Sequence, residues 1–198
     1  MKTPLLAVIA AAACGTATRQ GASEHVVAPA SYTAADVHFM GGMIGHHAQA
    51  VLIAGWAPSH AASAAVRALC ERIVVGQRDE IVLMQRWLRD RHETVPEVDT
   101  SRHSMPGMDH ASLMPGMLTA EQLEQLDSSR GPEFDRLFLK FMIQHHQGAI
   151  TMVNQLFGSQ GGGEEEIVYR FASDVYADQT TEIDRMTRML DVLRRSPM

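Results

Sequence analysis

Residues 36–47, DVHFMGGMIGHH, and residues 135–146, DRLFLKFMIQHH, are two copies of one pattern. Both fit D-x-x-F-x-x-x-M-I-x-H-H, and their residue numbers differ by 99. A second pattern, Q-x-x-E-I-x-x-M-x-x-x-L, begins at Gln77 and again at Gln179. The chain therefore contains a unit of two elements that occurs twice, which indicates an internal duplication.

Both elements of the repeated unit have the pattern of helices. Apolar residues recur at steps of three and four, and no stretch alternates with period two. Thr33 with Asp36, and Thr119 with Gln122, form N-terminal capping patterns. We expect helices near 34–55, 59–91, 133–157 and 164–194, and a short one near 120–128. Two helical hairpins joined by a long crossover predict an all-α fold, specifically a ferritin-like four-helix bundle.

The N-terminal residues are predicted to export the chain. One Lys, an apolar run of about nine residues and a series of small residues form a signal peptide over 1–13, too short to span a bilayer. Ala-Ala-Ala before Cys14 resembles a lipoprotein cleavage box, with Cys14 as the lipidated first residue. The alternative is ordinary cleavage, which releases a soluble secreted protein. We expect a periplasmic or cell-surface lipoprotein, organised as follows: tether 14–32, helical domain 33–198, repeat one 34–91, crossover 92–131 and repeat two 132–194.

Composition limits the partners of the chain. The 198 residues carry a formal charge of −6, which excludes the broad basic surface of a nucleic-acid-binding protein. Two Cys are too few for a disulfide scaffold or a cysteine-rich zinc module. The remaining predicted partners are a metal ion and, through a lipid on Cys14 alone, the membrane; homo-oligomerisation is left open. The unusual feature is 13 Met and 10 His, both common ligands of soft or borderline metals.

Polar residues interrupt the apolar face of each predicted helix at matching positions. A buried carboxylate is costly unless it is paired or ligated, so these residues form either a hydrogen-bond network or a metal site. Thioethers one turn before paired imidazoles suit copper, above all the reduced ion. Asp36 and Asp135 lie about three turns earlier and are expected to be helix caps. The predicted metal ligands are His46, His47, His145, His146, Met43, Met142, Glu80, Glu182, Gln77 and Gln179.

The crossover contains a second cluster of soft ligands. Met-Pro-Gly-Met occurs twice within 103–117, where Pro and Gly disfavour regular helix. These Met residues either bind metal or pack as an apolar loop on the helices. The candidate loop ligands are His103, Met105, Met108, His110, Met114 and Met117.

The motif D-x-x-F-x-x-x-M-I-x-H-H, with residues 147–149 after it and 116–119 before the second copy, resembles the domain of unknown function 305 family. The resemblance covers about residues 34–195. It implies a ferritin-like four-helix fold, and copper handling because some members are similar to periplasmic copper-binding proteins. The first repeat departs from the family pattern, since Ala48 and Gln49 stand where the second repeat has Gln147 and Gly148. The second repeat is therefore expected to bind metal better.

Three hypotheses follow for the function. The leading one is a non-enzymatic protein that binds or sequesters copper, or another metal, outside the cytoplasm. The alternative is a structural or interaction module whose polar His, Gln and Glu core holds no metal. A carboxylate di-metal oxidase is the third, although such sites need several Glu and Glu-x-x-His motifs. We predict no catalytic residue and no enzymatic activity.

Overall fold

The computed structural model describes residues 32–97 and 114–195. Over these residues it contains six helices: α1 (Ala34–Ala54), α2 (Ala57–His60), α3 (Ala64–Asp90), α4 (Ala120–Ser128), α5 (Pro132–Gly158) and α6 (Glu166–Arg195). The all-α prediction is confirmed. The predicted signal peptide, Cys14, and the loop ligands His103, Met105, Met108 and His110 lie outside the described residues.

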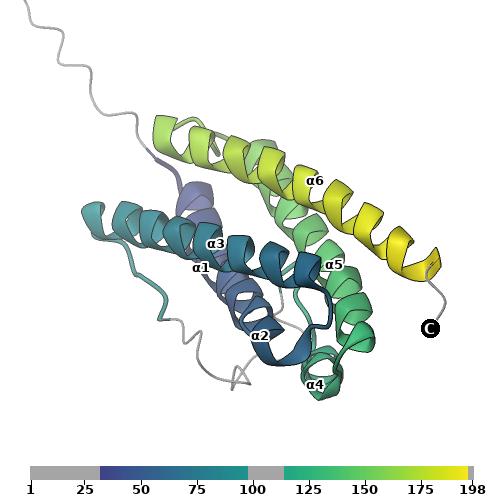
Figure 1. Ribbon diagram of the computed structural model, residues 1–198. Coiled ribbons are helices and arrows are strands. Elements are labelled where there is room, and N and C mark those ends of the chain that lie inside the picture. The colour runs from purple at the N-terminus through teal and green to yellow at the C-terminus, as the bar shows by residue number, and fades with distance from the viewer. Residues whose placement is uncertain (1–31, 98–113, 196–198) are drawn as a thin grey trace, which may run out of the picture.

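The four long helices form two hairpins. Helix α1 packs on α3, α5 packs on α6, and α1 also packs on α5 (Figure 1). One expected boundary is wrong, because 59–91 is two helices, α2 and α3, separated by extended residues. The Ser63 hydroxyl accepts from the backbone N–H groups of Ala65 and Val66, so α3 has its own N-terminal cap.

Both predicted capping boxes are present. Thr33 and Asp36 cap α1, and Thr119 and Gln122 cap α4. Because each box satisfies two helix-end N–H groups, these short local patterns are enough to fix where the helices begin.

The repeated aspartates, Asp36 and Asp135, each accept hydrogen bonds from the backbone of the other hairpin. Asp36 accepts from the backbone N–H of Gly163, in the α5–α6 turn, at 2.7 Å. Asp135 accepts from Ala62 and Ser63, before α3, at 3.2 and 2.7 Å. Asp135 was expected to cap its own helix, but no side chain caps the start of α5, and the Asp135 carboxylate binds the backbone of the other repeat instead.

Apolar packing divides into two clusters, one toward each end of the helices. One cluster contains Phe134, Phe138 and Leu69, and the other contains Phe39, Phe171 and Trp87. The middle of the molecule between these clusters is where the repeated polar residues lie. No helix among the described residues is long and apolar enough to cross a membrane.

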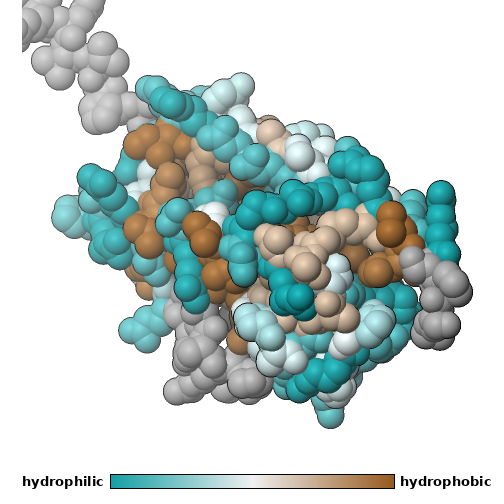
Figure 2. Space-filling view, viewed as in Figure 1, coloured by the Kyte–Doolittle hydropathy of each residue, from teal (hydrophilic) through white to brown (hydrophobic). Residues whose placement is uncertain are grey.

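The visible surface mixes polar and apolar side chains (Figure 2). The exposed large apolar residues are Val75, Val82, Leu83, Phe157, Ile167, Tyr169, Tyr176 and Val192. Homo-oligomerisation stays a prediction.

Candidate metal centre

The central histidine pair comes from the two inner helices. His46 on α1 and His145 on α5 are fully buried, and their ring centroids are 3.8 Å apart with an interplanar angle of 37°. Helices α1 and α5 pack against each other, so the duplication places the two copies of the His-His motif at the same level.

Three of the four ring nitrogens in this pair have no hydrogen-bond partner. His46 Nε2 donates to the carbonyl oxygen of Pro115 at 3.1 Å, because a carbonyl can only accept. His46 Nδ1 and both nitrogens of His145 are buried and make no hydrogen bond of normal geometry, although the His46 backbone lies close enough to the His145 ring to raise its pKa by a minor amount. Buried polar atoms are nearly always satisfied, so three such atoms in one pair of rings make this pair the candidate for a ligand site.

Burial keeps both rings neutral. Desolvation, followed by the neighbouring His47, lowers the pKa of His46 to about 3. Desolvation also lowers the pKa of His145 well below its usual value, with further lowering from His46. Since His46 Nε2 carries the hydrogen, its Nδ1 presents a lone pair at neutral pH.

The stability of the metal-free protein should therefore fall as the pH drops below about 6.5. Both pKa values are lower in the folded state than in the unfolded state, so the unfolded chain binds more protons below pH 6.5. Above pH 6.5 the contribution is fully present; between pH 6.5 and 5 each ring should cost on the order of 1 kcal/mol per pH unit. Urea unfolding at pH 7.5, 6.5, 5.5 and 5.0 measures this slope. An unchanged free energy of unfolding over this range would contradict the assignment of neutral rings.

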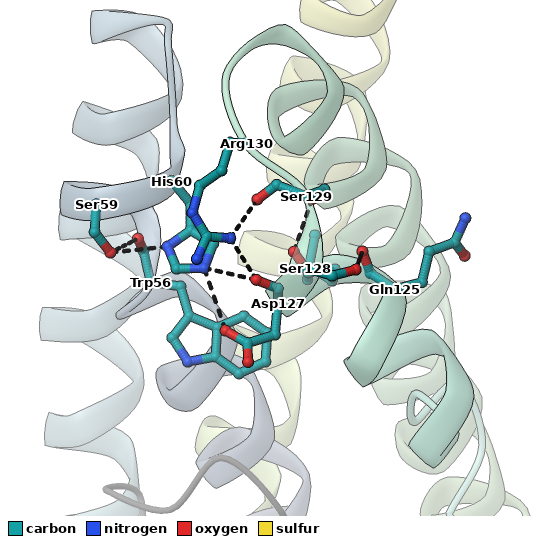
Figure 3. Close-up of polar contacts among 9 residues, drawn as sticks. Trp56, Ser59, His60, Gln125, Asp127, Ser128, Ser129 and Arg130 are labelled. Atoms are coloured by element: carbon teal, nitrogen blue, oxygen red, sulfur yellow. Dashed lines mark hydrogen bonds and ion pairs between the residues drawn. The ribbon is translucent and has the colours of Figure 1, made fainter.

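His60 shows how a purely structural histidine is bonded in the same protein (Figure 3). Its Nε2 donates to the carbonyl oxygen of Asp127 at 3.0 Å, with the Asp127 carboxylate at 3.2 Å. Its Nδ1 accepts from the Ser59 hydroxyl at 2.8 Å. Both nitrogens are satisfied, and the ring links α2 to the end of α4. His145 has no equivalent of these bonds.

The second histidine of each repeat is also buried and forms a hydrogen bond with a glutamate of its own hairpin. His47 Nε2 donates to Glu80 at 2.6 Å, and His146 Nε2 donates to Glu182 at 2.7 Å. Each bond joins the two helices of one hairpin, α1 to α3 and α5 to α6. Nδ1 of both histidines is buried without a partner.

Gln77 and Gln179 line a cavity of about 310 Å³ between α3 and α6. Both side chains are buried, and the Oε1 atom of each has no hydrogen-bond partner. The cavity is also lined by Glu80, Glu182 and Asp178. The pKa of Asp178 is raised, first by desolvation and then by the nearby carboxylates of Glu80 and Glu182.

The predicted ligands do not converge on one point. Within 32–97 and 114–195, no group of three or more His, Cys, Asp or Glu side chains is arranged to hold a metal ion. The predicted set divides into the central pair, two His–Glu pairs and two glutamines. Met43 and Met142 are fully buried in the apolar clusters on either side of this layer.

The end of the crossover lies on the central pair. Gly116 adopts a positive φ of 77°, and an added Cβ on Gly148 would lie 1.9 Å from the Pro115 oxygen. The Gln49 amide binds the backbone of Leu118 through two hydrogen bonds, of 2.7 and 3.1 Å. Met117 is buried and Met114 half-buried, so the two candidate loop ligands within the described residues pack on the helices.

A match to a protein-family model shows which family this chain belongs to. The family model for DUF305, a domain of unknown function, matches residues 36–190. The chain belongs to the DUF305 family. No curated protein matches the chain.

Solved DUF305 structures share the fold. A DUF305 fragment from Deinococcus radiodurans is 27% identical with a TM-score of 0.68, over 81% of this chain and 97% of that one. CopM in its Cu(II)-bound form is 27% identical with a TM-score of 0.64, over 79% and 95% of the two chains. CopM in its Cu(I)-bound form is 25% identical with a TM-score of 0.60, over 81% and 97%.

Sequence reasoning missed three residues of this DUF305 centre: Gln49, Pro115 and Gly148. Gln49 and Gly148 are the equivalent positions of the two repeats, and their difference was visible as a departure from the family pattern. Both contact the crossover, Gln49 by hydrogen bonds and Gly148 by leaving space. The sequence signal for these contacts was the difference between Gln49 and Gly148 at equivalent positions of the repeats. A single crossover cannot contact two symmetry-related helices in the same way, so the residues that contact it differ.

Proposed function

We propose that this DUF305 protein binds copper outside the cytoplasm, with the central pair His46 and His145 as its principal ligands. Support comes from the family and from CopM, which has been solved with Cu(I), Cu(II) and silver bound. The observation that supports the proposal most strongly is the buried, neutral pair, whose tilted rings lie 3.8 Å apart and leave three ring nitrogens without a hydrogen bond. Copper is a cargo in this proposal and supplies no chemical step.

The donor set fits the reduced ion better than a hard divalent ion. Imidazole nitrogen suits copper, and neutral thioethers favour Cu(I). Met43 and Met142 lie one turn before the central pair on the same helices, which makes them the proposed sulfur donors. Among the described residues, the nearby carboxylates Glu80 and Glu182 already bind His47 and His146, so they are not free to neutralise a divalent ion.

The extracytoplasmic location and the lipid anchor are part of the proposal. The support is the signal-like segment 1–13 and the similarity to a DUF305 protein from Streptomyces coelicolor named as secreted, 27% identical. The metal would then be bound in a compartment where Cys14 attaches the domain to a membrane surface.

A Cu(I) competition titration against a chromophoric chelator tests the pair. His46→Gln and His145→Gln approximately keep side-chain volume, and the amide in His46→Gln can still donate to the Pro115 carbonyl. We expect each to weaken the tightest Cu(I) site at least 100-fold, and the double variant to lose one equivalent. His92→Asn is the matched control: His92 is exposed and has a φ of 58°, which Asn tolerates. Unchanged affinity and stoichiometry in the double variant would overturn the proposal.

The second candidate is a structural module without metal, and the His–Glu bonds favour it. They join α1 to α3 and α5 to α6, so the Nε2 atoms of His47 and His146 have a structural role that needs no metal. These bonds do not explain His145, whose two ring nitrogens are unbonded. The same titration separates the candidates, since a structural module binds no Cu(I) in the unmodified protein.

A further inference from the structure

A groove between α1 and α5 is lined by three soft donors other than the residues of the buried pair. It has a volume of about 330 Å³ and is lined by His38, Met114 and Met152 among others. His38 is exposed, whereas Met152 is buried and Met114 is half-buried. The three side chains come from α1, the end of the crossover and α5.

Gly42 is the point where the two thioether side chains meet. A Cβ there would lie 3.0 Å from Met114 Sδ and 3.4 Å from Met152 Cε. His38 precedes Gly42 by four residues, which places the two on one face of α1, one turn apart. The lack of a side chain at Gly42 therefore leaves room for two Met side chains beside a histidine.

The groove contains no competing charge among its lining residues. The other lining residues are Ala34, Ala35, Phe39, Pro115, Gln155, Leu156 and Ser159. Without a carboxylate, a divalent cation would bring uncompensated charge into a largely apolar groove. A monovalent soft cation is better matched by one imidazole and two neutral thioethers.

We propose that His38, Met114 and Met152 form a second site, for a soft monovalent cation such as Cu(I), with Ag(I) as its probe. The site stands on its own donors and does not need His46 or His145. It goes beyond the proposed function by giving this protein an accessible site in addition to a buried one.

The experiment is an Ag(I) titration of the full chain labelled with 13C at the Met methyl groups. Met114→Leu and Met152→Leu assign the two methyl signals and conserve volume. We expect both methyl signals to shift together during the titration. Met152→Leu and His38→Ala should each lose one equivalent of Ag(I) or weaken that site at least tenfold. Met186→Leu is the matched control, because Met186 is a buried Met on α6 that does not line the groove.

Failure of this site and failure of the proposed function are distinguishable. In a His46→Gln/His145→Gln protein the Met114 and Met152 shifts should persist, since the groove has its own ligands. Met152 methyl signals that do not move at saturating Ag(I) would overturn the groove site, whatever the result at the buried pair. Unchanged Ag(I) stoichiometry and affinity in both Met152→Leu and His38→Ala would also overturn it.

Discussion

Replacing Gly148 by Ala is expected to destabilise the protein by about 3 kcal/mol or to expel the crossover turn from α5. In an open helix this change normally stabilises, by up to about 1 kcal/mol. Here the new Cβ would lie 1.9 Å from the Pro115 oxygen and 2.6 Å from Gly116 Cα. Both are backbone atoms, so no side-chain rotation relieves the contact. Urea unfolding gives the free energy of unfolding.

Gly76→Ala is the matched control for this change. Gly76 also lies inside a long helix, α3, but a Cβ there has no atom within 4 Å. This variant should be as stable as the parent or more stable, by up to about 1 kcal/mol. If Gly148→Ala matched Gly76→Ala, the close packing of the crossover on α5 would be wrong.

Replacing His145 by Leu should stabilise the metal-free protein by about 1–3 kcal/mol and weaken Cu(I) binding at least 100-fold. A buried polar atom without a partner carries an uncompensated desolvation cost, and His145 has two such atoms. An apolar side chain of similar size removes this cost and removes the proposed ligand. Urea unfolding without metal, combined with a Cu(I) competition titration, measures both effects.

His60→Leu should have the opposite effect on the free energy of unfolding. It removes a ring that is bonded to Asp127 and Ser59, so it should destabilise by about 1–3 kcal/mol without weakening the tight Cu(I) site. If His145→Leu destabilised the protein as much as His60→Leu does, His145 would be a structural residue.

The duplicated helices could be predicted because their signals are local. Steps of three and four between apolar residues and the Thr33 and Thr119 capping boxes depend on neighbours in sequence. The all-α class follows from these signals and from the repeat. They do not establish how the two hairpins close on each other, because that packing depends on contacts between distant residues.

The arrangement of the site could be predicted only in part. Adjacent histidines on a helix point about 100° apart, so one of each pair can face the interior, but periodicity does not say which. The structure places His46 and His145 inward and turns His47 and His146 to the glutamates. The break between α2 and α3 was missed because the Asp135 carboxylate that binds that backbone is more than 70 residues away. The close contact of Pro115 with Gly148 is equally non-local.

The most direct test of copper binding at the central pair is a crystal structure of the Cu(I)-loaded chain, with anomalous diffraction recorded at the copper edge. We expect an anomalous peak within coordinate-bond distance of His46 Nδ1 and a ring nitrogen of His145. A Cu(I)-loaded crystal with copper bound elsewhere and no peak between these two rings would contradict it.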